Sequence, residues 1–372
     1  MSSSPLTIVQ VLPALNGGGV ERGTVEVSRE LVQRGHRSIV VSGGGKLAKE
    51  IEDHGGVHVT MSIGEKSPLT FRHVVNLRNL VLRDRVDVLH ARSRVPAWVA
   101  WLCWKSLPKT NRPHFVTTAH GLYSVNRYSE IMTSGERVIA ISETVRSYLH
   151  QNYPRLAADR VCVIPRGVDP QDFPRGYQPS AEWLERWFQQ FPDLLGRPVI
   201  TLVGRLTRCK GHHDLIEIVD RLRKTIPEIR AVVVGGVDPK RQQYAAEIQA
   251  QIERRGLADH IVLAGHRSDV REIYAVSSVV LALTSDPPEA FGRTTVESLS
   301  MGIPVVGYEH GGTAEILKNL FPNGLVPAGH VDAAAKAIET ILAHGAPVPE
   351  NTLYLKERML AQTLAVYEEI AA

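Results

Sequence analysis

Cysteine and long apolar runs are both scarce in this 372-residue sequence. The three cysteines, Cys103, Cys162 and Cys209, have no metal-ligand spacing and are too few for a disulfide framework. They predict reduced thiols, as in a cytoplasmic protein. No apolar run approaches the roughly 20 residues that a membrane span needs. The N-terminus lacks the charged region of a signal peptide, so we interpret its apolar run as a first strand.

A large excess of charge is absent as well. The formal net charge is only +4, and the basic residues are spread along the chain, so we expect no nucleic-acid partner. Hydrophobic residues make up 43% and charged residues 22%, which is typical of a globular protein and excludes a disordered or fibrous one. Because 372 residues exceed what one hydrophobic core usually holds, we expect two domains.

Strand-like and helix-like segments alternate in both halves, as a doubly wound parallel α/β sheet requires. In the first half they are Leu6 to Leu12, Val20 to Arg34, Ser38 to Val41, Val86 to Leu89, Pro96 to Lys105, Phe115 to Thr117, Glu136 to Ile141, Glu143 to Asn152 and Val161 to Ile164. In the second half the strand-like segments are Val199 to Val203, Ile229 to Val234, Ile261 to Leu263, Val279 to Leu283 and Pro304 to Val306. The stretch between the halves is rich in Pro, Trp and Phe, which marks a boundary. We predict domains at 1–172 and 199–348, a linker at 173–198 and a final helix at 349–372.

The stretch from Thr284 to Gly302 contains a strand end, a loop and a helix start in that order. Pro287, Pro288 and Gly292 prevent regular structure before a good helix former begins at Arg293. The first N–H groups of such a helix suit a phosphate. Glu289 lies in the loop and Glu297 about one turn into the helix, so a bound diphosphate would have a carboxylate on each side.

Three other groups of glycine or polar residues follow predicted strands. The first contains Gly17, Gly18 and Gly19, which let a backbone approach a ligand closely. The second runs from Gly204 to Gly211 and carries Arg205 and Lys210, whose charges suit a diphosphate leaving group. The third group is a pair of histidines at strand ends, of which we favour His120 over His90. Ser142, at another strand end, is best explained as a helix N-cap.

The spacing of Glu289 and Glu297, with the FGRTTVES context, resembles the E-x7-E signature of family 4 retaining glycosyltransferases. The resemblance implies the GT-B fold, in which two Rossmann-like doubly wound domains face a central cleft and a last helix crosses back to the first domain. It implies that Glu289 holds the donor sugar, Glu297 the ribose, and Arg205 and Lys210 the diphosphate. The remaining donor-binding residues that it implies are Gly18, Gly19, Arg267, Phe291, Gly292, Arg293 and Thr294. His120, which the resemblance places near the reacting sugar, joins Glu289, Arg205 and Lys210 as the expected catalytic residues.

The same resemblance implies transfer from a nucleotide-diphosphate sugar to a hydroxyl acceptor with retention at the anomeric carbon. A UDP-sugar is favoured over GDP-mannose or ADP-heptose because it is the more frequent donor. No cofactor and no metal are expected. The acceptor would be a glycan or a lipid-linked sugar of bacterial lipopolysaccharide or a similar envelope polysaccharide.

Alternative functions remain open at this point. The segment Gly43 to Ala48 fits a dinucleotide fingerprint and would suit an NAD(P)-dependent dehydrogenase, but it follows the second strand and no acid ends a strand about 20 residues on. A nucleotide-sugar-binding protein without catalysis is a second alternative, and a nucleotide-sugar 2-epimerase is a third.

The expected acceptor side is rich in arginine, with Arg92, Arg94 and Arg127 in loops at strand ends. Arginine pairs with phosphate or carboxylate, which predicts an anionic acceptor. Nearby, three tryptophans recur every three residues at Trp98, Trp101 and Trp104. They are explained either by packing in the core or by contact with the inner face of the cytoplasmic membrane, which would make the protein peripheral.

Overall fold

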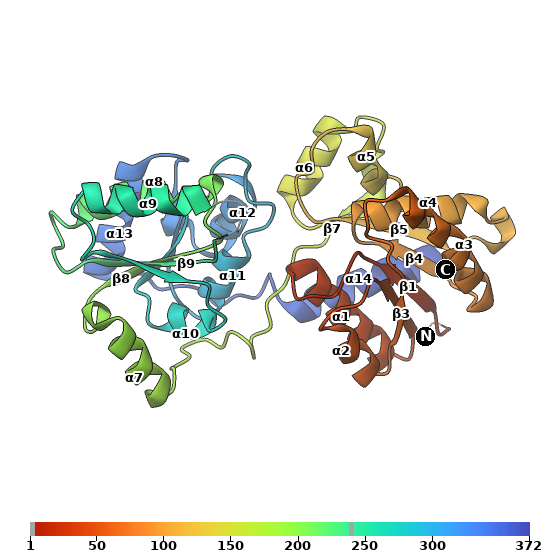
Figure 1. Cartoon of the computed structure of the whole chain (residues 1–372), viewed down its shortest axis with the longest axis horizontal. Coiled ribbons are helices and arrows are strands. Elements are labelled where there is room, and N and C mark those ends of the chain that lie inside the picture. Colours follow the sequence, from red (N-terminus) through yellow and green to blue (C-terminus); the bar gives the residue numbers. More distant parts are fainter. Residues whose placement is uncertain (1–3, 238–241) are drawn as a thin grey trace. The chain divides into compact units, whose positions relative to one another are not determined.

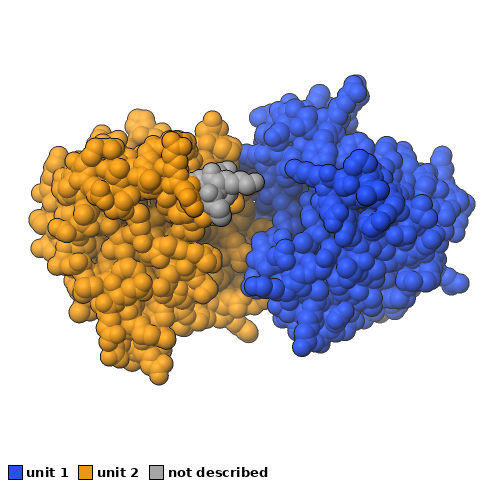
Figure 2. Space-filling view, in the orientation of Figure 1, with its two compact units in different colours: residues 1–165, 357–372 blue, residues 166–356 orange. Residues whose placement is uncertain are grey.

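The computed structural model describes residues 4–237 and 242–372, and these form two compact units. The first unit contains residues 1–165 and 357–372, and the second contains residues 166–356 (Figure 2). The chain therefore leaves the first unit once and returns to it through its last helix.

The first unit is built on a seven-stranded parallel sheet with the strand order β3-β2-β1-β4-β5-β6-β7. Its strands are β1 Thr7–Val11, β2 Arg37–Ser42, β3 Val57–Thr60, β4 Val88–Ala91, β5 His114–Ala119, β6 Arg137–Ala140 and β7 Val161–Val163. Strand β1 pairs in register with β2 on one side, with Val9 opposite Ile39, and with β4 on the other. The direction in which the chain winds reverses between β1 and β4, and ligands bind at such a switch point.

Helices cover both faces of this sheet because its buried strands are apolar on both sides. They are α1 Gly19–Gln33, α2 Ala48–Asp53, α3 His73–Arg83, α4 Arg94–Ser106, α5 Arg127–Glu130, α6 Glu143–Asn152 and α14 Lys356–Ala371. On one face, Ile8 and Val88 pack with Leu360, Leu364 and other residues of α14. On the other face, the neighbouring strand residues pack against α3 and α4, which lie side by side (Figure 1).

The second unit contains a six-stranded parallel sheet with the order β10-β9-β8-β11-β12-β13. Its strands are β8 Val199–Val203, β9 Arg230–Val234, β10 Ile261–Gly265, β11 Val279–Ala282, β12 Val305–Tyr308 and β13 Leu325–Val326. Its helices are α7 Ala181–Gln190, α8 His212–Leu222, α9 Gln242–Arg254, α10 Val270–Ala275, α11 Arg293–Ser300, α12 Gly311–Leu320 and α13 Val331–His344. Helices α8 and α9 lie on one face of the sheet and α7 and α10 on the other (Figure 1). Its switch point lies between β8 and β11.

Two of the predicted boundaries differ from the structure. The final helix begins at Lys356 and not at Pro349, because the Asn351 side chain accepts a hydrogen bond from Tyr354 N (2.9 Å) and holds the preceding residues in a turn. The stretch 173–198, expected to be a linker, belongs to the second unit and contains α7. Trp183 and Trp187 of α7 are buried against Val199 and Val232, so the aromatic residues of this stretch form part of a core.

The tryptophans of α4 pack against the core of the first unit. The Trp98 indole N–H donates to the Tyr128 carbonyl (3.0 Å), and that of Trp104 donates to the Pro113 carbonyl (2.8 Å). Trp101 meets Trp98 edge to face, and Lys105 lies over both Trp101 and Trp104. These contacts favour core packing over the membrane explanation for the helix.

Candidate functional site

The switch point of the second sheet brings together two loops that are about 80 residues apart in the sequence. Strand β8 leads into the loop that carries Arg205 and Lys210, and its neighbour β11 leads into the loop that carries Glu289. The carboxyl ends of neighbouring parallel strands meet at one sheet edge, so the loops face each other.

Lys210 and Glu289, both expected to be catalytic, are in direct contact. The Lys210 ammonium donates to Glu289 Oε2 in a short ion pair and also lies 3.4 Å from Thr284 Oγ1. The Thr284 hydroxyl in turn lies 3.3 Å from the same carboxylate oxygen. Both charged side chains are partly exposed, so a ligand that enters from solvent can reach them. Thr284 lies two residues beyond the end of β11, and the sequence analysis assigned it no role in the site.

The loop from Glu289 to Gly292 is fixed by the start of α12. The Gly312 N–H donates to the Glu289 carbonyl (2.7 Å), and a Cβ at Gly312 would lie 2.4 Å from Phe291 Cα. Gly292 has a φ of +94°, a conformation that glycine adopts at little cost. The Gly312 N–H thus holds the loop that carries Glu289.

Glu297 lies on α11 and is only 7% exposed. Its Oε1 accepts a hydrogen bond from Arg293 Nε at 2.6 Å, and the Tyr274 hydroxyl lies 3.4 Å from its Oε2. Burial raises the pKa of Glu297, and it outweighs Arg293 and Tyr274, which act in the opposite direction. The carboxylate is thus held in place by Arg293 and Tyr274, and Tyr274 was not identified from the sequence.

Three other expected donor residues of the second unit lie in the β8 loop, in the loop before α11 and in the first turn of α11. Arg205 is exposed near the start of the β8 loop, while Phe291 is buried with its ring 5.9 Å from that of Tyr354. Thr294 is half-buried in the first turn of α11.

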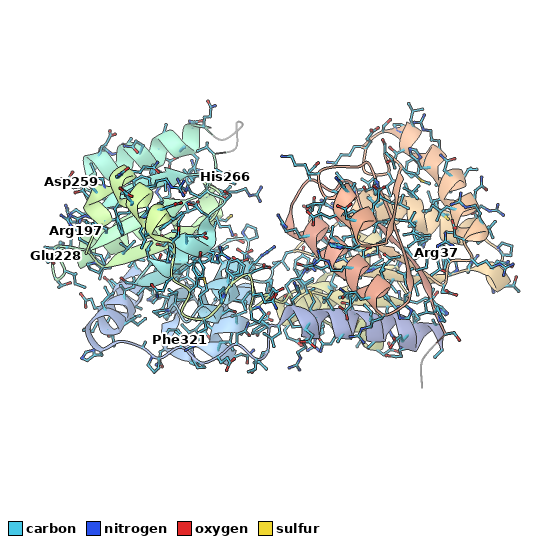
Figure 3. All side chains as sticks on the ribbon, turned by 90° about the horizontal axis from the view of Figure 1, so that it is seen from below. Arg37, Arg197, Glu228, Asp259, His266 and Phe321 are labelled. Carbon is cyan, nitrogen blue, oxygen red and sulfur yellow. The ribbon has the colours of Figure 1, made fainter. Side chains whose placement is uncertain are left out.

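Arg267 lies in a different environment from Arg205. It forms two hydrogen bonds to Asp269 (2.8 and 2.5 Å), and its guanidinium stacks over Trp187 at 5.3 Å. These residues, together with His266, which is labelled in Figure 3, line a cavity of about 530 Å³. The Arg267 guanidinium is therefore already engaged by Asp269 and Trp187 of the same unit. That Arg267 binds the donor stays a prediction.

In the first unit, the switch point places the glycine loop beside the end of β4. Gly18 is the N-cap of α1 and Gly19 its first residue. A Cβ at Gly18 would lie 2.2 Å from Glu21 Oε2, so the Glu21 carboxylate lies against the start of α1. Ser142 is confirmed as an N-cap, since its hydroxyl accepts from Val145 N at 3.0 Å.

The two histidines differ in their surroundings. His90 is buried, with Nδ1 2.6 Å from the Tyr367 hydroxyl and Nε2 2.7 Å from Thr118 Oγ1. Both ring nitrogens are thus used inside the unit, which supports a structural role. His120 follows β5 and is partly exposed, and its backbone N–H donates to the Tyr123 hydroxyl (3.1 Å).

The three arginines expected on the acceptor side are not equally accessible. Arg92 is only 3% exposed, and its Nη1 donates to Gln10 Oε1 at 2.8 Å. Burial lowers the pKa of Arg92, because a charge removed from water is poorly solvated. Arg94 donates to Ser129 Oγ (3.2 Å) and lies over the Tyr123 ring, whereas Arg127 is exposed at the start of α5. Arg94 and Arg127 remain the better candidates for an acceptor contact.

Comparison with known proteins identifies the family. The model of the family "Glycosyl transferases group 1" matches residues 185–356, and that of "Glycosyltransferase Family 4" matches residues 17–172. A crystal structure of a glycosyltransferase from Rickettsia africae is 30% identical, covers 99% of both chains and superposes with a TM-score of 0.84. The chain belongs to the group 1 glycosyltransferases. The predicted GT-B fold is thereby confirmed.

Two further proteins show how far the likeness extends. The glycosyltransferase is 26% identical to one component of the human phosphatidylinositol N-acetylglucosaminyltransferase, over 96% of this chain and 74% of that protein. The Anabaena protein HepE, crystallised with UDP, is 21% identical, covers 98% of this chain and 95% of its own, and has a TM-score of 0.74. At that identity the likeness shows the fold alone. The dehydrogenase alternative is set aside, because the family models match most of both units.

The described part of the glycosyltransferase lacks both a metal-ligand cluster and a membrane-spanning helix. It contains no group of three or more His, Cys, Asp or Glu residues arranged to hold a metal ion. None of its described helices is both long and apolar enough to cross a membrane.

Proposed function

We propose that this glycosyltransferase moves a sugar from a nucleotide-diphosphate sugar, with UDP as the favoured nucleotide, to a hydroxyl of a glycan or glycolipid acceptor with retention at the anomeric carbon. The observation that carries the proposal is the contact between Lys210 and Glu289 at the switch point. The loop that carries Glu289 leads directly into α11, on which Glu297 is buried. One cation and two carboxylates at the start of a helix suit a diphosphate flanked by a sugar and a ribose.

In the proposed reaction the bond between the anomeric carbon and the diphosphate oxygen breaks, and the acceptor oxygen bonds to that carbon on the same face. The acceptor proton passes to the departing phosphate oxygen, so no separate protein base is needed. Lys210 and Arg205 stabilise the charge that develops on the diphosphate. Glu289 holds the donor sugar, Glu297 holds the ribose, and His120 lies near the reacting carbon.

Lys210 has a second task in this proposal. Without a donor, the Lys210 ammonium is paired with the Glu289 carboxylate. When a donor binds, its diphosphate competes with Glu289 for the ammonium, and its sugar hydroxyls bind the Glu289 carboxylate. Thr284, which lies within 3.4 Å of both charged groups, keeps the carboxylate near its place during the exchange.

The experiment that tests the nucleotide is a thermal-shift panel of UDP, GDP and ADP. A ligand present at 100 times its dissociation constant stabilises the folded chain by about 2.7 kcal/mol, which such a panel detects. We expect the largest shift with UDP. Release of sugar from the matching donor without acceptor, followed by acceptor trials, separates an enzyme from a binding protein. A folded chain that binds none of the three nucleotides contradicts the proposal.

We further propose an anionic, lipid-linked acceptor in lipopolysaccharide or envelope polysaccharide synthesis, used by a cytoplasmic protein peripheral to the inner face of the membrane. Exposed Arg127 and aromatic-stacked Arg94 support an anionic acceptor, because guanidinium groups pair well with phosphate or carboxylate. A preference for phosphorylated over neutral sugar acceptors, reduced by Arg94→Ala with Arg127→Ala, is expected. Equal use of both acceptor types removes this part of the proposal.

A further inference from the structure

One short segment of the first unit exposes an unusual amount of apolar surface. Leu69, Phe71 and Val75 are 71%, 49% and 60% exposed and lie within seven residues of one another. They occupy the 3₁₀ helix η1 (Pro68–Arg72) and the first turn of α3. Single exposed apolar residues are common on soluble proteins, but three that are this exposed on one short segment require an explanation.

The segment is anchored on its inner side, so the exposure is a property of its fold. Ser67 caps η1, Thr70 is buried with its hydroxyl donating to the Glu65 carbonyl (2.9 Å), and Leu77 of α3 lies in the core of the first unit. The buried residues Thr70 and His73 are three residues apart, which is one turn of a 3₁₀ helix, so they share the inner face. Leu69 and Phe71, on either side of Thr70, lie on the exposed faces of the same turn.

Positive charge is interleaved with the apolar side chains. Residues 66–83 contain four cations, Lys66, Arg72, Arg78 and Arg83, and no acid. Arg83 is paired with Asp84 (2.6 Å). Among residues 4–237 and 242–372, no ion pair involves Lys66, Arg72 or Arg78, and the first two are exposed.

We propose that the surface formed by residues 66–78, the η1–α3 surface, docks on an anionic lipid bilayer. Exposed Leu and Phe on a helical segment enter the boundary between headgroups and acyl chains, and neighbouring Lys and Arg pair with lipid phosphates. This charge complementarity favours a bilayer over a second copy of the chain, which would bring the same cations together. The inference rests on the proposed function, since it gives the enzyme access to a lipid-linked acceptor. It assigns that access to η1 and α3 and not to the tryptophans of α4.

The test is co-sedimentation of the full chain with vesicles of phosphatidylcholine alone or with about 30% phosphatidylglycerol, at about 0.05 M and about 0.5 M salt. The wild type should bind the anionic vesicles, and less so at high salt. Leu69→Ser with Phe71→Ser should lower the partition coefficient by about tenfold or more, because the inserted apolar area is lost. Lys66→Gln with Arg72→Gln should remove most of the preference for anionic vesicles.

The matched control is Leu195→Ser, because Leu195 is 62% exposed in the second unit and lies outside the proposed surface. It should bind vesicles like the wild type. The inference is overturned if the wild type does not bind anionic vesicles, or if Leu69→Ser with Phe71→Ser binds as well as the wild type. It is also overturned if that variant abolishes self-association in sedimentation velocity while vesicle binding persists.

The UDP thermal shift, measured on the same variants, separates the two proposals. A normal shift with no vesicle binding overturns the η1–α3 surface and leaves the proposed function standing. No shift with any nucleotide overturns the proposed function, whatever the vesicles show.

Discussion

At the scale of single residues, the functional proposal depends on where two carboxylates and one ammonium lie. Glu289 is partly exposed and held by a lysine, whereas Glu297 is buried and held by an arginine and a tyrosine. The first is therefore free to exchange partners, while the second is fixed before any ligand arrives. A fixed acceptor of hydrogen bonds loses little freedom on binding, which favours affinity.

Lys210→Ala should leave the chain folded, because the side chain is partly exposed, and should slow transfer on the order of 10²–10³-fold, as expected for the loss of one group that stabilises the departing charge. The measurement is turnover at saturating donor, together with the melting temperature. Lys318→Ala is the matched control, since Lys318 forms an exposed ion pair with Glu309 in the same unit (2.8 Å). Wild-type turnover in Lys210→Ala would show that the site is wrongly assigned.

Glu297→Gln should weaken UDP binding and yet stabilise the ligand-free chain at neutral pH. Burial raises the pKa of Glu297 in the folded chain above its ordinary 4.5. The contribution of this group to the free energy of unfolding is therefore fully present below pH 4.5 and is lost as the pH rises through the folded-state pKa. The ionised side chain therefore costs stability near pH 7, and glutamine removes the cost.

Melting temperatures of wild type and Glu297→Gln between about pH 4 and pH 8 check this prediction. The difference should be small at the acidic end and grow toward neutral pH. Glu309→Gln, at an exposed ion pair, should show no such trend. A variant that melts below the wild type at pH 7 would contradict the assigned sign.

At the scale of elements, the central strands were predictable, and so were the edge strands β7 and β10, whereas the edge strands β3 and β13 were not recognised. Strands β1, β8, β9 and β11 are runs of β-branched and other apolar residues buried on both faces, which is the pattern that sequence periodicity detects. Strand β3 pairs on one side only and is partly exposed, and its VHVT sequence was not recognised. Helix α3, also missed, lacks a capping side chain.

The contact between Lys210 and Glu289 shows what sequence alone could not supply. Each residue could be placed after a strand, but their meeting depends on β8 lying next to β11, a pairing between segments about 80 residues apart. Strand order is fixed by such long-range packing. The roles of Thr284 and Tyr274 follow from the same packing, and neither has a characteristic spacing.

The last helix belongs to the core of the first unit, and a single residue tests this. Leu364 is 1% exposed and packs with Ile8 and Val116. Leu364→Ala should cost about 2–5 kcal/mol, because it leaves a cavity between helix and sheet. Urea unfolding measures the loss, and exposed Glu357→Ala on the same helix is the control. A change below about 1 kcal/mol would mean that α14 is only loosely attached.

At the scale of the whole molecule, the residues proposed to bind the donor are divided unequally between the units. Arg205, Lys210, Glu289 and Glu297 all lie within residues 166–356, while Gly18, Gly19 and His120 lie in the first unit. The second unit also has its own sheet and its own core around Trp187 and Val232. Donor binding and transfer should therefore depend on different parts of the chain.

Transfer should survive EDTA, because Arg205, Lys210 and the first N–H groups of α11 are proposed to stabilise the leaving diphosphate. The measurement is the transfer rate after chelation and after addition of Mg²⁺ or Mn²⁺. Complete loss that either ion restores would contradict this assignment of the charge stabilisation.

Residues 166–356, expressed alone, should fold and bind UDP but transfer no sugar. Folding is expected because this segment is continuous in sequence and forms a complete parallel sheet covered on both faces. UDP binding is expected because the cations and both glutamates are present. Transfer should be lost because His120 and the glycine loop are absent.

Calorimetry with UDP on the segment and on the full chain measures the binding expectation, and Glu297→Gln in both gives the matched control. If the folded segment bound UDP more than tenfold more weakly than the full chain, a difference of about 1.4 kcal/mol, residues of the first unit would have to contribute to nucleotide binding. The glycine loop around Gly18 and Gly19 would then be the first candidate, because a glycine precedes the first turn of α1 as Gly292 precedes that of α11, and both starts expose backbone N–H groups.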